Sequence, residues 1–139
     1  MTETEGRRER TASCLCGSLK VVARGEPVDV YLCSCLDCQR RSGSAFAYAA
    51  LYDETAVTPE GERRTWRRHG DSGRAIENHF CPACGVTVLF HSEGLPGLVG
   101  VAAGCFADPD FAQPSRLYWA TRHHHWLDLP EAIASEETQ

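Results

Sequence analysis

The sequence predicts an all-β domain. Short segments that are β-branched, or that alternate apolar and polar residues, recur at regular spacing with almost no helical period. Eight cysteines, most of them in closely spaced groups, indicate that metal ions staple small antiparallel sheets. The 139 residues suit one domain with its own core, and we find no internal repeat and no linker.

The first half of the chain alternates strands with turns. Residues 1–9 are charged and aperiodic and are expected to form a disordered tail, with a strand beginning near Arg10. β-Branched and aromatic residues then mark the strands, and Gly or Pro marks their ends. In chain order, the predicted elements are a strand over 19–24, a strand over 28–33, one short helical turn over 36–41 that Gly43 ends, a strand over 45–52 and a turn over 57–62.

The second half continues this pattern to about residue 130. The predicted elements are an exposed strand over 63–69, a turn over 70–73, a strand over 74–80 that runs into Cys81, strands over 86–90 and 98–103, and a last strand over 117–121. Residues 131–139 are acidic and are expected to form a frayed tail. The sequence therefore predicts a single β domain over residues 10–130.

Cys33, Cys35 and Cys38 form the cluster that matters most for function. Cysteines this close cannot comfortably pair with one another, because a disulfide needs Cα atoms about 4.4–6.8 Å apart with converging Cβ vectors. They can converge on one tetrahedral metal ion, for which zinc is the natural candidate. Three protein ligands leave a fourth position for water or substrate, as in a catalytic zinc site.

The remaining cysteines suggest a second site of different character. Cys14-x-Cys16 and the distant Cys81-x-x-Cys84 can be brought together by the fold into a closed, structural four-thiolate site. Cys105 is left over in an apolar segment and is expected to be a buried packing thiol rather than a metal ligand. Two zinc ions per chain are therefore expected.

Composition narrows the partners and the compartment. Lys+Arg 14 against Asp+Glu 19 gives a net charge of −5, which argues against general binding to nucleic acid or to an anionic membrane. Residues 1–10 lack an apolar signal-peptide core, and the sequence has no uncharged stretch long enough to span a bilayer. A reducing cytoplasm, with metal sites rather than a secreted disulfide framework, is the expected setting.

Polar residues beside the three-cysteine cluster have competing interpretations. Arg40 and Arg41 either offset the charge of the metal site and grip a substrate carboxylate, or form a solvated helix face. Asp37 is expected to cap the start of the helical turn rather than to act as a base. Ser34 either donates to a metal-bound sulfur or is an exposed hydroxyl.

Histidines and tryptophans carry weaker signals. His123, His124 and His125 resemble a metal patch, but alternate residues of a strand face opposite sides, so a solvated strand end is expected. His79 is expected to be a satisfied packing residue rather than a general base. Core and pocket roles remain open for three tryptophans, Trp66, Trp119 and Trp126.

The motifs together resemble the glutathione-dependent formaldehyde-activating enzyme (GFA) family, which includes the centromere protein V relatives. The matching segments are 13–17, 33–40, 42–46, 70–73, 79–85, 96–99 and 126–130. The resemblance implies a mostly-β GFA domain with a structural zinc on Cys14, Cys16, Cys81 and Cys84 and a catalytic zinc on Cys33, Cys35 and Cys38. It also implies a carbon–sulfur lyase that forms S-hydroxymethylglutathione from glutathione and formaldehyde.

Two positions depart from the family pattern. Ser34 stands where the family usually has His, and Leu117-Tyr118 stands where it has a His-aromatic pair. The departure at position 34 predicts a reduced rate.

The predicted function is a zinc-dependent carbon–sulfur lyase-like enzyme that acts on a thiol–aldehyde adduct. The alternatives are a non-catalytic zinc-binding module, the same chemistry on another thiol or aldehyde, and a thiol redox protein based on Cys81 and Cys84. The predicted partners are a glutathione-like thiol and an aldehyde, with no nucleic acid and no membrane. The sequence leaves the true substrate and the oligomeric state open.

Overall fold

The computed structural model describes residues 8–70 and 72–139. Its strands are β1 (Glu9–Ser13), β2 (Lys20–Arg24), β3 (Asp29–Cys33), β4 (Ala47–Asp53), β5 (Val57–Glu60), β6 (Arg64–His69), β7 (Ala75–Phe80), β8 (Thr87–Ser92), β9 (Leu98–Ala102), β10 (Arg116–Tyr118) and β11 (Ala134–Ser135). The helical elements are α2 (Leu36–Ser42) and the 3-10 turns η1 (Glu54–Ala56), η2 (Ala103–Phe106) and η3 (Ala120–Arg122). The prediction of a mostly-β fold with one short helix is confirmed.

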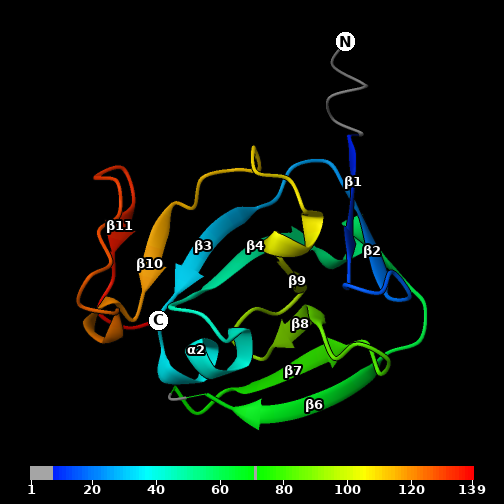
Figure 1. Cartoon of the computed structure of the whole chain (residues 1–139), viewed down its shortest axis with the longest axis horizontal. Helices are drawn as coiled ribbons and strands as arrows, with labels where there is room; N and C mark the ends of the chain where they lie inside the picture. Colours follow the sequence, from blue (N-terminus) through cyan, green and yellow to red (C-terminus); the bar gives the residue numbers. More distant parts are fainter. Residues whose placement is uncertain (1–7, 71) are drawn as a thin grey trace.

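The strands form two sheets. The smaller has the order β1-β2-β5, and the larger has the order β11-β10-β3-β4-β9-β8-β7-β6. Most pairings are antiparallel, but β10 pairs in parallel with both β3 and β11. Figure 1 shows the larger sheet bending, so that β3 and β4 lie on one side of α2 and β6 and β7 on the other.

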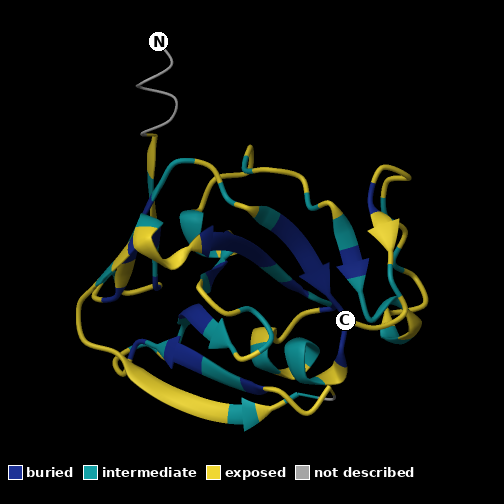
Figure 2. Ribbon diagram, turned by 180° about the vertical axis from the view of Figure 1, so that it is seen from behind, coloured by how far each residue is buried: buried dark blue, intermediate teal, exposed yellow. Residues whose placement is uncertain are grey.

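The two faces of the larger sheet bury different side chains. Alternation along β4 places Ala50 and Tyr52 on the face that packs against Val21 of the smaller sheet and Leu19 just before it. Ala49 and Leu51 point to the opposite face. That second face carries Tyr31, Cys33 and Phe90 beside α2. Burial is deepest in β3 and β4, whereas β6 is exposed along most of its length (Figure 2).

Gly100 gives the second face its shape. Gly100 and Phe90 are register partners on β9 and β8. A Cβ atom at position 100 would lie 2.1 Å from the Phe90 ring, so only glycine lets this ring lie across the sheet.

Two expectations fall partly on residues outside the described part of the chain. The predicted tail over 1–9 lies mostly there, although Glu9 already belongs to β1. Asp71, within the turn predicted over 70–73, also lies outside the described residues.

The turn predicted over 57–62 is wrong. Residues Val57–Glu60 form β5, which pairs with β2 and places Pro59 opposite Val21. Proline lacks an N–H and is tolerated on an edge strand, where that donor is not needed. β5 is such an edge strand, so Pro59 does not interrupt it.

The C-terminal segment also differs from its prediction. The last strand, predicted over 117–121, ends at Tyr118, because Trp119 adopts a positive φ of 55° and starts η3. The end of the chain is not frayed, since β11 pairs with β10 and Ile133 is buried with Leu32 and Leu117. The buried side chain of Ile133 holds an otherwise polar segment against the sheet. No helix formed by the described residues is long and apolar enough to cross a membrane.

Candidate metal centres and active site

Four cysteines meet between the two sheets. Cys14 and Cys16 follow β1, and Cys81 and Cys84 follow β7. Their sulfurs all lie within 4.8 Å of one another, with 3.7 Å between those of Cys14 and Cys16 and 3.6 Å between those of Cys16 and Cys81. A tetrahedral thiolate site with bonds of about 2.3 Å places its sulfurs about 3.8 Å apart. The cluster therefore fits a metal ion.

Hydrogen bonds favour the thiolate form at two of these sulfurs, those of Cys14 and Cys81. The backbone N–H of Leu19 donates to Cys14 Sγ at 3.2 Å, and that of Ala83 donates to Cys81 Sγ at 3.3 Å. The Ser18 hydroxyl lies 3.1 Å from Cys81 Sγ. Hydrogen bonding by this hydroxyl, followed by the N–H of Cys84, lowers the pKa of Cys81 to about 6.

The three-cysteine cluster is built by one continuous segment. Cys33 ends β3, Cys35 is the N-cap of α2, and Cys38 lies in the first turn of α2. Their sulfurs also lie within 4.8 Å of one another. Hydrogen bonds from the thiols of Cys33 and Cys38 lower the pKa of Cys35, and hydrogen bonding to Cys35 and Cys38 raises the pKa of Cys33. Gly43 ends the helix in the left-handed conformation, as predicted.

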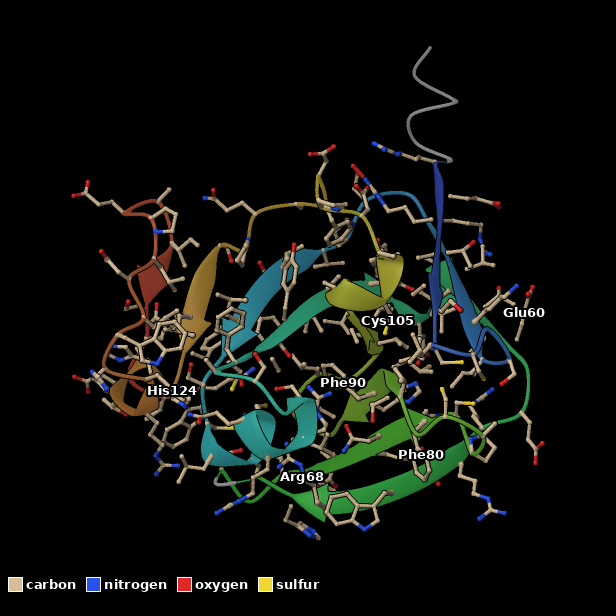
Figure 3. All side chains as sticks on the ribbon, viewed as in Figure 1. Glu60, Arg68, Phe80, Phe90, Cys105 and His124 are labelled. Carbon is tan, nitrogen blue, oxygen red and sulfur yellow. The ribbon has the colours of Figure 1, made fainter. Side chains whose placement is uncertain are left out.

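This second cluster lines a pocket of about 230 Å³ on the second face of the larger sheet. The other walls carry aromatic rings and cations. Its aromatic lining includes Tyr31, Phe90, Tyr118 and Trp119, and its cationic side chains are Arg41, Arg68 and Arg74. Figure 3 shows Phe90 above α2 and Arg68 at its foot. An open pocket therefore faces the three thiols, whereas the four-cysteine cluster lies outside it.

The structure separates the two candidate arginines. Arg41 lines the pocket, with its guanidinium 6.0 Å from the centroid of the Phe90 ring. The Arg40 side chain is 78% exposed, lies 3.8 Å from Asp37 and does not line this pocket. Arg41 is thus placed to meet a ligand, and Arg40 belongs to a solvated helix face.

Arg68 is a site cation that sequence reasoning missed. Its side chain is only 11% exposed and bonds Asp37 at 3.2 Å, which links β6 to α2. Alternation along β6 did not single it out, because Trp66, two positions away on the same strand, is exposed.

Two predictions for small polar residues were wrong. Asp37 does not cap α2, because the N-cap sulfur of Cys35 accepts from the Cys38 N–H at 3.3 Å. Ser34 is neither exposed nor bonded to a sulfur. It is fully buried, and its hydroxyl donates to the carbonyl of Ala45 at 3.2 Å.

His79 is buried and fully partnered. Arg63 Nε donates to its Nδ1 at 3.0 Å, so Nε2 carries the proton that faces Glu77 Oε1 at 2.9 Å. His91 Nδ1 lies 3.3 Å from the same Nε2. The side chains of Glu77, His79 and His91 are close enough to hold a metal. A metal on His79 Nε2 would need this nitrogen unprotonated, whereas the hydrogen bond from Arg63 to Nδ1 keeps the proton on Nε2. Burial lowers the pKa of His79.

The three consecutive histidines do not end a strand. They follow η3, and His124 Nε2 lies 2.9 Å from Gln39 Oε1 on α2. None of the three belongs to a group of metal-ligating side chains within the described part of the chain.

Cys105 lies apart from both cysteine clusters. It packs against the core between the sheets, and burial raises its pKa. All eight cysteines lie in the described residues, and all are free thiols. Among the tryptophans, Trp119 lines the pocket, whereas Trp66 and Trp126 are exposed.

Comparisons with known proteins agree with this architecture. A family model described as glutathione-dependent formaldehyde-activating enzyme matches residues 9–122. A Rhodobacter sphaeroides protein of known crystal structure is similar in fold, with a TM-score of 0.54 and 20% sequence identity over 75% of this chain and 91% of that chain. A comparison with curated protein sequences gives no match. The family match covers most of the chain, and we conclude that the chain belongs to the glutathione-dependent formaldehyde-activating enzyme family.

Proposed function

We propose that this chain is a zinc-dependent carbon–sulfur lyase that joins the thiol of glutathione to formaldehyde, or catalyses the reverse reaction. The observation that carries the proposal is the three-cysteine cluster in the wall of a cationic, aromatic pocket. The family match supports the same chemistry.

The donor sets support a different role for each cluster. We infer that Cys14, Cys16, Cys81 and Cys84 hold a structural zinc and that Cys33, Cys35 and Cys38 hold a catalytic one. Zinc held by three thiolates would keep one place open, where it could bind the substrate sulfur and lower its thiol pKa. Unpaired cysteines of this kind fit a reducing compartment such as the cytoplasm.

The reaction needs no oxidant or reductant. The sulfur lone pair adds to the formaldehyde carbon, the π pair of the C=O bond moves to oxygen, and the thiol proton ends on that oxygen. The side chains of the pocket then have to hold an anionic thiol in place. Arg41 and Arg74 are suited to its carboxylates, because guanidinium groups form charge-assisted hydrogen bonds with carboxylates.

The residues at the two departures from the family pattern have defined surroundings, and only Tyr118 among them lines the pocket. Ser34 is turned to the carbonyl of Ala45, so its hydroxyl is not available to shuttle protons, and we expect a reduced rate. Leu117 is buried in the core, and Tyr118 lines the pocket in a T-shaped contact with Tyr31, with ring centroids 5.3 Å apart.

The test is the rate of S-hydroxymethylglutathione formation, followed by exchange NMR with zinc-loaded protein. We expect acceleration over the buffer reaction. The matched control is Cys38→Ser, which should lose one zinc and the acceleration while keeping the fold. If the intact protein neither accelerates the reaction nor binds glutathione, a non-catalytic zinc-binding module is the better account.

A further inference from the structure

Asn78, in the middle of β7, is a buried amide without a partner. The residue is 4% exposed, and neither Nδ2 nor Oδ1 has a hydrogen-bond partner among the described residues. A buried amide that makes no hydrogen bond destabilises the folded protein. Such a group calls for an explanation.

The neighbours of Asn78 cannot satisfy it. Its register partners are Trp66 on β6 and Phe90 on β8. The residues that share its face of β7, two positions away on either side, are Ile76 and Phe80. The residues beside Asn78 in the sheet are therefore apolar or aromatic, and none of them is hydrogen-bonded to its amide.

The position of Asn78 indicates a ligand-binding role for its amide. Asn78 lines the same pocket as Cys33, Cys35 and Cys38. Arg68 lines this pocket too, and its Nε is a second buried donor without a hydrogen-bond partner in the part of the chain that the structure describes. Two side chains with unsatisfied polar atoms thus lie in the wall of the pocket that the three thiols line.

We propose that Asn78 determines substrate specificity by binding a peptide group of the thiol substrate. Nδ2 would donate to the peptide carbonyl, and Oδ1 would accept from the peptide N–H. A carboxylate offers only acceptors, so it would satisfy Nδ2 alone, whereas a peptide group satisfies both atoms. Asn78 would then favour a thiol carried on a peptide, such as the glutathione of the proposed function, over a simple thiol. This inference rests on the proposed function, since it assumes that a thiol occupies the pocket.

The experiment compares two thiols of equal charge on the zinc-loaded protein. N-acetylcysteine carries a carboxylate and an amide, and 3-mercaptopropionate carries a carboxylate alone. Calorimetry would measure Kd for both with the wild type, with Asn78→Leu and with the control Glu77→Gln. Leu matches Asn closely in size, and Glu77 lies on the same strand but on the opposite face.

We expect the wild type to bind N-acetylcysteine more tightly than 3-mercaptopropionate. Asn78→Leu should raise the Kd for N-acetylcysteine about 10-fold or more and leave the Kd for 3-mercaptopropionate unchanged. Glu77→Gln should change neither Kd. The Tm of Asn78→Leu should stay level or rise, because the variant removes an unsatisfied amide. A purely structural role would instead lower the Tm and leave the difference between the two thiols intact.

The remaining outcomes separate this inference from the proposed function. If both thiols bind and the amide gives no advantage, the role of Asn78 is refuted and the proposed reaction stands. Binding that depends on the amide, without any rate acceleration, would refute the reaction and keep the inference. If neither thiol binds, both are overturned.

Discussion

The two cysteine clusters use the same ligand type in opposite ways. The four-cysteine cluster joins residues 14–16 to residues 81–84, and so ties the smaller sheet to the end of β7. The three-cysteine cluster comes from six consecutive residues and faces a pocket. The comparison teaches that sequence separation favours a structural role for the four-cysteine cluster, because a metal that joins distant segments would stabilise the fold by holding them together.

The two clusters also differ in the formal charge that they would carry with zinc bound. Four thiolates with Zn²⁺ carry a formal charge of −2, and three carry −1. The three-cysteine cluster shares its pocket with Arg41, Arg68 and Arg74, of which Arg68 is paired with Asp37. Cations beside a pocket that holds thiolates suit an anionic ligand.

The largest expected effect comes from breaking the four-cysteine site. Cys81 is fully buried in the core, and Cys81→Ser should abolish cooperative folding. Structural zinc contributes about 10–16 kcal/mol in zinc-finger peptides, which is as large as the net stability of about 5–15 kcal/mol typical of a domain. Circular dichroism with thermal melting and metal content would measure this. A well-folded, cooperative Cys81→Ser protein would contradict the structural assignment.

A chelator should separate the two sites in order. With zinc bound, the three-cysteine site would keep an exchangeable place open to the pocket, whereas the four-cysteine site would require a thiolate to detach first. A mild chelator should therefore remove one zinc and abolish thiol binding with the fold kept, and harsher treatment should remove the second zinc and unfold the domain. Zinc release and circular dichroism, followed together, would show this. Release of both metals in one step with unfolding would mean that the sites are equally closed.

Arg40 and Arg41 offer a matched pair beside the three-cysteine site. Arg41→Gln should raise the KM for glutathione about 10-fold or more, since a hydrogen bond to a charged group contributes about 1.5–3 kcal/mol. Arg40→Gln should leave KM close to the wild-type value, because this side chain is exposed outside the pocket. Steady-state kinetics of both variants test the pair. Equal changes in KM for the two variants would contradict the different roles of Arg40 and Arg41.

The smallest effect is expected at Cys105, which belongs to neither cluster. Cys105→Ala should keep both zincs and cost about 1 kcal/mol of packing energy. Metal analysis and denaturant unfolding would measure these two quantities. Loss of a zinc in this variant would show that Cys105 is a metal ligand.

The sequence alone determined the fold class and the grouping of the cysteines. Strand periodicity and Gly43 predicted most of the elements, because both are local signals. Ligand spacing predicted that Cys33, Cys35 and Cys38 form one group and the pairs at 14–16 and 81–84 another, since a tetrahedral metal site needs sulfurs brought close together.

Only the tertiary structure decided the walls of the pocket. Asn78 and Arg68 lie on strands that meet the cysteines through the bend of the larger sheet, and no local pattern reports that meeting. Arg40 and Arg41 are adjacent and chemically identical, so only the orientation of α2 against Phe90 distinguishes them. The pairing of β5 and the anchoring of Ile133 depend in the same way on partners distant in sequence. Side-chain spacing along the chain is local, whereas burial and pocket lining are set by long-range packing.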